Sequence, residues 1–264
     1  MSPSRHILKG TPTAHRAPEP EKSGLPPRIR FVRTLVLWDI DHTLITVGPL
    51  SREIYEGAFL TVTGRPAREL AHMAGRTDRA IIGETLHMHG IETSESLITR
   101  FAGELAAGFS SRSRDISDHG RVLPGAKAAL TALAARPDVI QSVLTGNTRS
   151  IAISKLTALS LDEYVDFDVG AYGFDHHERP PLVRLARQRA ADKYGERFDK
   201  HHTVLVGDTP YDVHAGHHGG ARVVAVATGA SDEASLRQAG AELVLSDLTD
   251  THAVVRSVLN TTPR

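Results

Sequence analysis

The 264-residue sequence contains no cysteine. Disulfide bonds, a thiolate nucleophile and a cysteine-ligated metal are therefore excluded. The chain also lacks a net charge at pH 7, because 31 lysine and arginine residues balance 31 aspartate and glutamate residues. Composition thus gives no reason to expect a nucleic acid, an anionic membrane surface or a strongly charged protein as the partner.

Long apolar runs are absent as well, since none approaches the roughly 20 residues that a helix needs to cross a bilayer. The N-terminal residues are partly basic, but no apolar stretch follows them, so we expect no secretory signal. The lack of cysteine fits a reducing compartment. We therefore expect a cytoplasmic protein without a membrane partner.

Residues 1–30 differ in composition from the rest of the chain, with six prolines and few large apolar side chains. Such a segment cannot bury enough apolar surface to offset the entropy lost on ordering. We predict a disordered tail here; a docking or nucleic-acid-binding arm is the alternative.

From Thr34 onward, short apolar runs alternate with longer stretches of helical pattern. The runs are continuous and rich in valine and leucine, which is typical of parallel strands buried on both faces. This alternation predicts an open, doubly wound α/β fold with a parallel sheet. The predicted strands are residues 35–38, 139–144, 204–206, 223–226 and 243–245.

One interval breaks the alternation, because only helical patterns occur between Ile45 and Val122. The simplest explanation is a helical domain inserted into the first crossover of the sheet. We therefore expect an α/β core domain formed by residues 31–46 and 120–264, with a helical domain over residues 47–119.

Polar side chains follow three of the predicted strands. Asp39 and Asp41 follow the first strand, a Thr-Gly-Asn segment at residues 145–147 follows the second, and Asp208 and Asp212 follow a later one. Ligands of open α/β sheets bind outside the carboxyl ends of the strands. Up to four carboxylates are therefore expected to meet in one crevice.

Clustered carboxylates repel one another unless a cation is present. Four acids, with no cysteine and no well-spaced histidine pair, describe an oxygen-ligand site that suits Mg²⁺. Taken alone, Asp39 and Asp41 are explained equally well as loop caps, and Thr145 as the cap of the next helix. The second acidic pair favours the metal site.

These segments resemble, in order, three motifs of the haloacid dehalogenase superfamily. DIDHT at residues 39–43 resembles its D-x-D-x-[TV] motif, TGN at residues 145–147 its second motif, and GDTPYD at residues 207–212 its G-D-x-x-x-D motif. The helical insertion lies where that family carries a small α-helical cap. The resemblance covers about residues 32–260 and is to phosphoglycolate-phosphatase-like members.

The resemblance implies a catalytic role for several residues. Asp39 would be the nucleophile that forms an aspartyl-phosphate. Asp41 would be the general acid for the leaving group and then the base for the hydrolytic water. Thr145 and the amide of Gly146, with Asn147 beside them, would bind the substrate phosphoryl group.

The resemblance also implies a Mg²⁺ ligand set. Asp39 and Asp208 would supply carboxylates, and Asp41 would supply its main-chain carbonyl. Asp212 would act through water or by orienting its neighbours. Dehalogenases of the family lack an aspartate equivalent to Asp41, so its presence favours phosphoryl chemistry over carbon–halogen cleavage.

The family's third motif normally contains a lysine, often before a proline. Arg179 stands at the matching place, where an arginine keeps the positive charge and can donate to phosphate in a fork. Lys155 is the other candidate, but we expect it to face solvent from the helix after the second motif. We therefore favour Arg179 as the catalytic cation.

Arg76 lies in a Gly-Arg-Thr-Asp segment between predicted helices of the insertion. In related enzymes this part of the cap hangs over the active site, so Arg76 could bind an anionic end of the substrate. Thr77 and Asp78 are also explained as the N-cap and first turn of a helix. Both interpretations can hold.

Together these features imply a Mg²⁺-dependent phosphatase acting on a small phosphorylated metabolite, as a monomer or homodimer. A phosphoglycolate-like substrate is favoured over sugar phosphates, nucleoside monophosphates and pyrophosphate. Two alternatives stay open: a phosphomutase of the same superfamily, and a regulatory or binding module with low activity.

Overall fold

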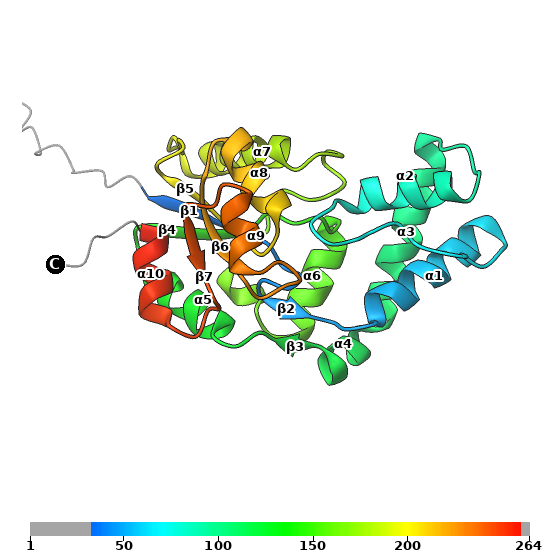
Figure 1. Ribbon diagram of the computed structural model, residues 1–264, viewed down its shortest axis with the longest axis horizontal. Helices are drawn as coiled ribbons and strands as arrows, with labels where there is room; N and C mark the ends of the chain where they lie inside the picture. Colours follow the sequence, from blue (N-terminus) through cyan, green and yellow to red (C-terminus); the bar gives the residue numbers. More distant parts are fainter. Residues whose placement is uncertain (1–32, 260–264) are drawn as a thin grey trace, which may run out of the picture. The chain divides into compact units, whose positions relative to one another are not determined.

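Five parallel strands form the central sheet (Figure 1). In the computed structural model, which describes residues 33–259, they lie in the order β4-β1-β5-β6-β7. This confirms the predicted α/β fold with a parallel sheet; the predicted tail lies outside the described residues. The strands are β1 (Thr34–Trp38), β4 (Val139–Val143), β5 (Thr203–Gly207), β6 (Arg222–Val226) and β7 (Leu243–Leu245).

Alternate residues of β1 face opposite layers of helices, which explains why its sequence is continuously apolar. Leu35 and Leu37 pack in one cluster with side chains of α7 and α8, whereas Val36 and Trp38 pack with α5, α6 and α10. Figure 1 shows α7 and α8 on one side of the sheet and α5 and α10 on the other. The helices are α5 (Ala126–Ala134), α6 (Arg149–Ala158), α7 (Pro180–Tyr194), α8 (Pro210–Gly219), α9 (Glu233–Gln238) and α10 (Thr251–Leu259), with a 3₁₀ turn at Asp162–Tyr164.

Four helices separate two very short strands, β2 (Ile45–Thr46) and β3 (Arg121–Val122), which pair antiparallel. The chain therefore passes through helices alone between these strands, as its pattern indicates. Because all described residues belong to one compact unit, the division into a core and a helical domain stays a prediction. The helices are α1 (Leu50–Thr63), α2 (Asp78–Met88), α3 (Glu95–Ser111) and α4 (Ser113–His119).

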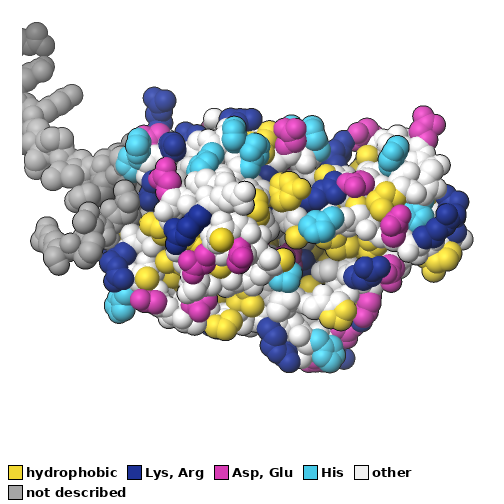
Figure 2. All heavy atoms as spheres, in the orientation of Figure 1, with side chains coloured by type: hydrophobic (Ala, Val, Ile, Leu, Met, Phe, Trp, Pro, Cys, Tyr) yellow, Lys and Arg dark blue, Asp and Glu magenta, His cyan; other side chains and the backbone are white. Residues whose placement is uncertain are grey.

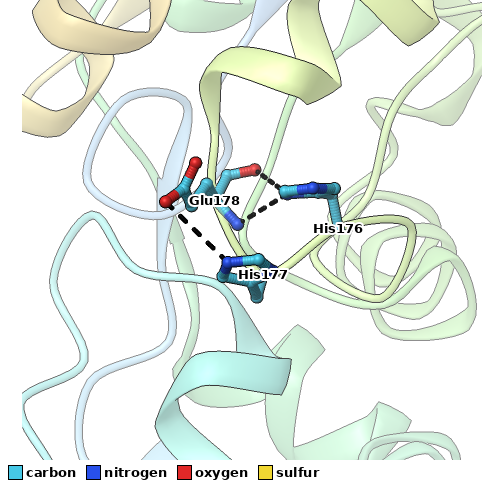
Figure 3. Close-up of side chains that lie close together, drawn as sticks. All are labelled: His176, His177 and Glu178. Atoms are coloured by element: carbon cyan, nitrogen blue, oxygen red, sulfur yellow. Dashed lines mark hydrogen bonds and ion pairs between the residues drawn. The ribbon is translucent and has the colours of Figure 1, made fainter.

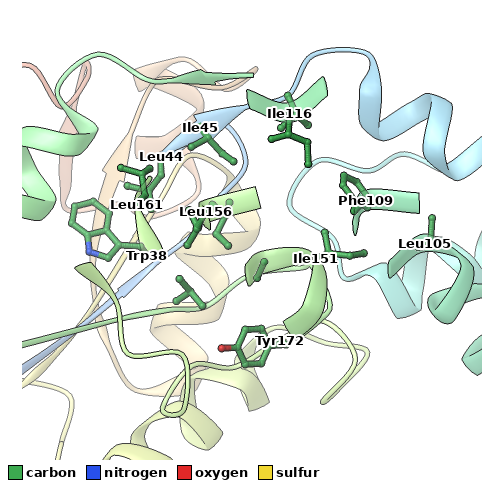
Figure 4. Close-up of a cluster of buried hydrophobic side chains, with 14 of the residues drawn as sticks. Trp38, Leu44, Ile45, Leu105, Phe109, Ile116, Ile151, Leu156, Leu161 and Tyr172 are labelled. Atoms are coloured by element: carbon green, nitrogen blue, oxygen red, sulfur yellow. The ribbon is translucent and has the colours of Figure 1, made fainter. Parts of the chain in front are cut away.

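One large apolar cluster continues from the sheet into these helices (Figure 4). Phe109 of α3 and Ile116 of α4 lie near Ile151 and Leu156 of α6 in this cluster. All four side chains are buried. This packing places residues 47–119, called the helical segment below, over the C-terminal end of β4, after which α6 begins.

Charged side chains of both signs are interspersed over the face drawn in Figure 2, in keeping with the balanced composition. Among residues 33–259, no helix combines the length and apolar character needed to traverse a bilayer.

Candidate active site

The three predicted motif segments line one pocket of about 220 Å³, at the C-terminal ends of β1, β4 and β5. The segment around Arg76 and several side chains of α1, α2 and α3 line it from the other side. Asp212 is fully buried and is not among the lining residues. The predicted site residues that line the pocket are Asp39, Asp41, Arg76, Thr145, Gly146, Asn147, Arg179 and Asp208.

A tight turn after β1 presents the first two acids. The amide of Asp39 still donates to Val206 of β5 at 2.8 Å, and the carbonyl of Ile40 then accepts from the amides of Leu44 and Ile45. His42 takes a left-handed conformation with φ of 62°. Because the chain turns here, Asp39 and Asp41 both reach the pocket although they are two residues apart.

Asp39, Asp208 and Asp212 form a buried cluster, with one carboxylate oxygen of each within 4.8 Å of the others. Burial raises the pKa of Asp39 well above its usual value, and the charges of Asp212 and Asp208 raise it further, against the lowering effect of Arg179. Burial, followed by the charge of Asp212, raises the pKa of Asp208 to about 7. The acids therefore repel one another, as expected where buried carboxylates outnumber the positive charges beside them.

The donor set fits a hard cation such as Mg²⁺, which prefers carboxylate oxygens. Asp212 is the weakest candidate ligand, because its Oδ2 accepts from the amide and hydroxyl of Thr209 at 3.1 and 2.6 Å and its Oδ1 accepts from Arg179. The bond from the Thr209 amide belongs to the capping box of α8, in which the Thr209 hydroxyl also accepts from the amide of Asp212. Asp39 and Asp208 are therefore the carboxylates best placed to hold such a cation.

Arg179, at the start of α7, points into the acidic cluster. Its Nη2 donates to Asp39 Oδ1 at 3.1 Å and also to Asp212 Oδ1. Burial lowers the pKa of this guanidinium, but the charges of Asp212 and Asp39 outweigh burial and raise it. Within the described part of the chain, Arg179 Nε is the one buried side-chain polar atom without a hydrogen-bond partner.

Lys155 does not face solvent, so that expectation was wrong. Its side chain is 3% exposed, and Nζ donates to both carboxylate oxygens of Asp41 at 2.8 Å and to Asn147 Oδ1 at 2.9 Å. Lys155 follows buried Ile151 by four residues, so both lie on the inward face of α6. That i, i+4 spacing was the signal available in the sequence.

The Asp41 carboxylate consequently lies apart from the cluster of the other three acids. Asn147 Nδ2 donates to its Oδ2 at 2.7 Å, in addition to the two bonds from Lys155. Burial raises the pKa of Asp41, but the charge and hydrogen bonds of Lys155 and the bond from Asn147 outweigh burial and lower it. Asp41 is therefore held in its ionised form.

Thr145 and Gly146 form the floor of the pocket after β4. The Thr145 hydroxyl accepts from the amide and side chain of Asn147 at 3.2 and 2.8 Å. A Cβ at Gly146 would lie 1.9 Å from the carbonyl of Arg76, so only glycine allows this approach of the helical segment. The loop that carries Thr145 is thus in direct contact with the segment before α2.

A family model described as haloacid dehalogenase-like hydrolase matches residues 36–226. The chain belongs to this family. No curated protein matches the sequence.

Solved structures similar to this haloacid dehalogenase-like hydrolase share its fold at low identity. A hydrolase from Pseudomonas syringae is 22% identical with a TM-score of 0.61, over 83% of this chain and 95% of that chain. A HAD hydrolase of family IA from Entamoeba histolytica is 18% identical with a TM-score of 0.64, over 86% and 99%. A protein described as a predicted phosphoglycolate phosphatase, from Haemophilus somnus, is 19% identical with a TM-score of 0.56, over 84% and 98%.

In this haloacid dehalogenase-like hydrolase, Asp78 joins the helical segment to the loop after β4. Its Oδ1 accepts from the hydroxyl of Tyr55 at 2.5 Å, its Oδ2 from the amide of Thr148 at 2.8 Å, and its own amide donates to Gly146 at 2.7 Å. Burial raises the pKa of Asp78 to about 6, although the bond from Tyr55 lowers it. Asp78 was expected only in the first turn of a helix, and it does lie in the first turn of α2.

Arg76 lies at the mouth of the pocket with its charge already paired. It forms an ion pair with Glu84 of α2 and donates to the carbonyl of His72 at 3.3 Å. Thr77 caps α2 by accepting from the amide of Ala80 at 3.2 Å. The segment therefore serves as a helix start while Arg76 lines the pocket.

His176, His177 and Glu178 form a second group of metal-ligand side chains, on the loop before Arg179 (Figure 3). The two imidazole rings stack with centroids 4.5 Å apart. His177 Nε2 lies 3.8 Å from Glu178 Oε1, and His176 Nδ1 accepts from the Glu178 amide at 2.9 Å. None of the three lines the pocket.

Proposed function

We propose that the protein is a Mg²⁺-dependent phosphatase that hydrolyses a small phosphomonoester through an aspartyl-phosphate on Asp39. The observation that carries this proposal is the buried meeting of Asp39, Asp208 and Arg179 at a pocket. Carboxylates and a guanidinium in this arrangement match the two needs of phosphoryl transfer, which are a cation-binding site and donors for phosphoryl oxygens.

Asp39 would attack phosphorus with one carboxylate oxygen. Arg179 donates to Oδ1 of Asp39 and so holds the carboxylate in one orientation, which leaves Oδ2 for the attack. The new bond joins Asp39 to phosphorus as the bond from phosphorus to the leaving oxygen breaks. In the second step, water attacks phosphorus, and inorganic phosphate leaves as the Asp39 carboxylate is restored.

Three groups of this chain would contact the phosphoryl oxygens: the hydroxyl of Thr145, the amide of Gly146 and Nε of Arg179. The last is a buried donor with no protein partner, which is the state expected of a group that serves a ligand. Mg²⁺ bound by the carboxylates of Asp39 and Asp208 and the carbonyl of Asp41 would supply positive charge against the same oxygens.

Asp41 would move the protons in both steps. Its carboxyl group would protonate the leaving oxygen, and its carboxylate would accept a proton from the attacking water. The ionised form in which Lys155 and Asn147 hold Asp41 is the one required for the second step. For the first step, Asp41 would have to receive a proton before the ester bond breaks.

The substrate that we favour is a small phosphomonoester such as phosphoglycolate. Arg76 is the cation on the helical side of the pocket that could meet a carboxylate, once it parts from Glu84. The side chains of Tyr55, Ile81 and Phe109 line the pocket on the same side and limit the space for the leaving group. A compact leaving group is therefore preferred over a nucleoside.

The experiment is phosphate release from a panel of phosphate esters, with Mg²⁺ or with EDTA. We expect activity that requires Mg²⁺ and is lost in Asp39→Asn, whereas Asp192→Asn, which changes an exposed aspartate of α7, stays active. No release from any ester would favour the binding module, and an isomerised ester without free phosphate would favour the phosphomutase. Full activity of Asp39→Asn would remove the nucleophile assignment.

A further inference from the structure

We infer that Lys155 is a positioning residue for Asp41, and that it fixes the orientation of the Asp41 carboxyl group toward the leaving oxygen of the substrate. The inference rests on the proposed phosphatase function. It concerns a side chain of α6 that lies outside the three motif segments.

The geometry around Asp41 leaves its carboxylate little freedom. Lys155 Nζ contacts both oxygens at 2.8 Å, and Asn147 Nδ2 contacts Oδ2 at 2.7 Å. Lys155 also holds Asn147 through its Oδ1 at 2.9 Å, so the three side chains form a closed triangle of hydrogen bonds. The carboxylate is thereby kept in one orientation at the wall of the pocket.

Packing does not explain a lysine at this place. Its neighbours on the inward face of α6, Ile151 and Leu156, are buried apolar side chains, and an apolar residue would continue that face. A buried ammonium costs free energy unless it is paired, and replacing a buried ion pair with apolar side chains is often neutral or stabilising. The charge of Lys155 is therefore best explained by its partner Asp41.

A side chain of the helical segment also contacts Lys155. The ring of Phe109 on α3 lies with its centroid 5.0 Å from Lys155 Nζ, a distance at which an ammonium is attracted to an aromatic face. Phe109 also lines the pocket. Asp39, Asp41 and Lys155 line the same pocket as Phe109, so a leaving group bound there would lie within reach of the carboxyl group that Lys155 orients.

A positioned acid matters most where the leaving group needs a proton. An alkyl phosphate such as glycerol 2-phosphate releases an alkoxide unless it is protonated, whereas p-nitrophenyl phosphate releases a stable phenolate. Loss of general acid catalysis lowers rates by about a hundredfold or more. A general disturbance of the pocket would instead slow both substrates alike.

The test compares Lys155→Met with the wild type on these two esters. We expect kcat for glycerol 2-phosphate to fall by about a hundredfold or more, and kcat for p-nitrophenyl phosphate by less than about tenfold. The KM values and inhibition by inorganic phosphate should change little, because the hydrogen bonds of Lys155 go to Asp41 and Asn147 and not to the three groups proposed to contact the phosphoryl oxygens. Lys155→Arg, which retains a donor and the charge, should recover part of the loss.

Lys127→Met is the matched control, because Lys127 also lies over an aromatic ring, that of Tyr164, but is exposed and lies outside the pocket. It should leave both rates unchanged. If Lys155→Met does not fold, Lys155→Gln keeps one donor and gives the same comparison. Equal losses on both esters, no loss, or a gain on glycerol 2-phosphate overturn the inference; a gain would show that Lys155 keeps Asp41 ionised and does not orient it for proton transfer. A wild type inactive on every ester overturns the phosphatase proposal itself.

Discussion

A single nitrogen of Arg179, Nη2, donates both to Asp39 after β1 and to Asp212 at the start of α8. Asp212 in turn is held by Thr209 in the capping box of α8. The guanidinium is therefore fixed by a helix terminus, and the orientation of Asp39 depends on that terminus.

Replacing Arg179 with methionine should lower kcat for phosphate release by about a hundredfold or more, because a donor to the phosphoryl group is lost. It should also destabilise the fold by about 3–5 kcal/mol, since the buried Asp39 and Asp212 lose their cation. Arg179→Lys should be intermediate in both respects. Steady-state kinetics and urea unfolding measure the two effects, and a kcat for Arg179→Met within twofold of wild type would contradict the proposed role.

Mg²⁺ should stabilise the protein against unfolding. The repulsion that raises the pKa values of Asp39 and Asp208 is relieved by a cation between them. At a Mg²⁺ concentration of 100 times Kd, the gain should be about 2.7 kcal/mol. Thermal unfolding with and without Mg²⁺ measures it. Asp208→Asn should lose the shift and Asp118→Asn, at an exposed aspartate of α4, should keep it; an equal shift in both variants would argue against this metal site.

The pH dependence of stability should contain a contribution from Asp78. Its pKa rises from 3.8 to about 6 on folding, so its contribution is full below pH 3.8 and is lost as the pH rises through about 6. Relative to Asp78→Asn, which cannot titrate there, the wild type should gain about tenfold in folding equilibrium, or about 1.4 kcal/mol, between pH 8 and pH 5. Urea midpoints at the two pH values test this. A difference between the two proteins that stays constant with pH would show that Asp78 titrates normally.

The ion pair with Glu84 should weaken the binding of an anionic substrate by Arg76. With Glu84→Gln the ion pair to Arg76 is removed, so KM for phosphoglycolate should fall several-fold while KM for glycerol 2-phosphate stays constant. Stability should change by less than about 1 kcal/mol, since the Glu84 side chain is about half exposed. Glu233→Gln, which removes a similar pair on α9, is the control. An equal change in KM for phosphoglycolate and for glycerol 2-phosphate would show that Arg76 does not bind the carboxylate of the leaving group.

Much of the core could be predicted because buried parallel strands have a strong sequence signal. All five predicted runs are strands of the sheet. The two-residue strands β2 and β3 were not predicted, since so short a pair has no periodicity to detect. Only helical patterns were expected between Ile45 and Val122, and the structure places four helices there, with α4 directly after α3.

The meeting of Asp39, Thr145 and Asp208 could be predicted because each follows a strand of the same parallel sheet, and such ends share one edge. The burial of Lys155 was predicted wrongly, because a charged residue in a helix was assigned to the solvent side without counting from Ile151. The contacts of Asp78 could not be foreseen, because they depend on how a distant helix meets the loop after β4.

The pairing of β2 with β3 brings the two ends of the helical segment together. Residues 47–119 therefore begin and end at neighbouring points of the structure. An exchange of that whole segment for another would therefore alter neither the register of β1 against its neighbours nor the spacing of the acids beyond it. A replacement must reproduce the cover that α3 gives to α6 and the bonds that Asp78 makes with the loop after β4. The junction of Thr46 and Arg121 is thus a natural splice point for grafting a new recognition surface onto an unchanged catalytic frame.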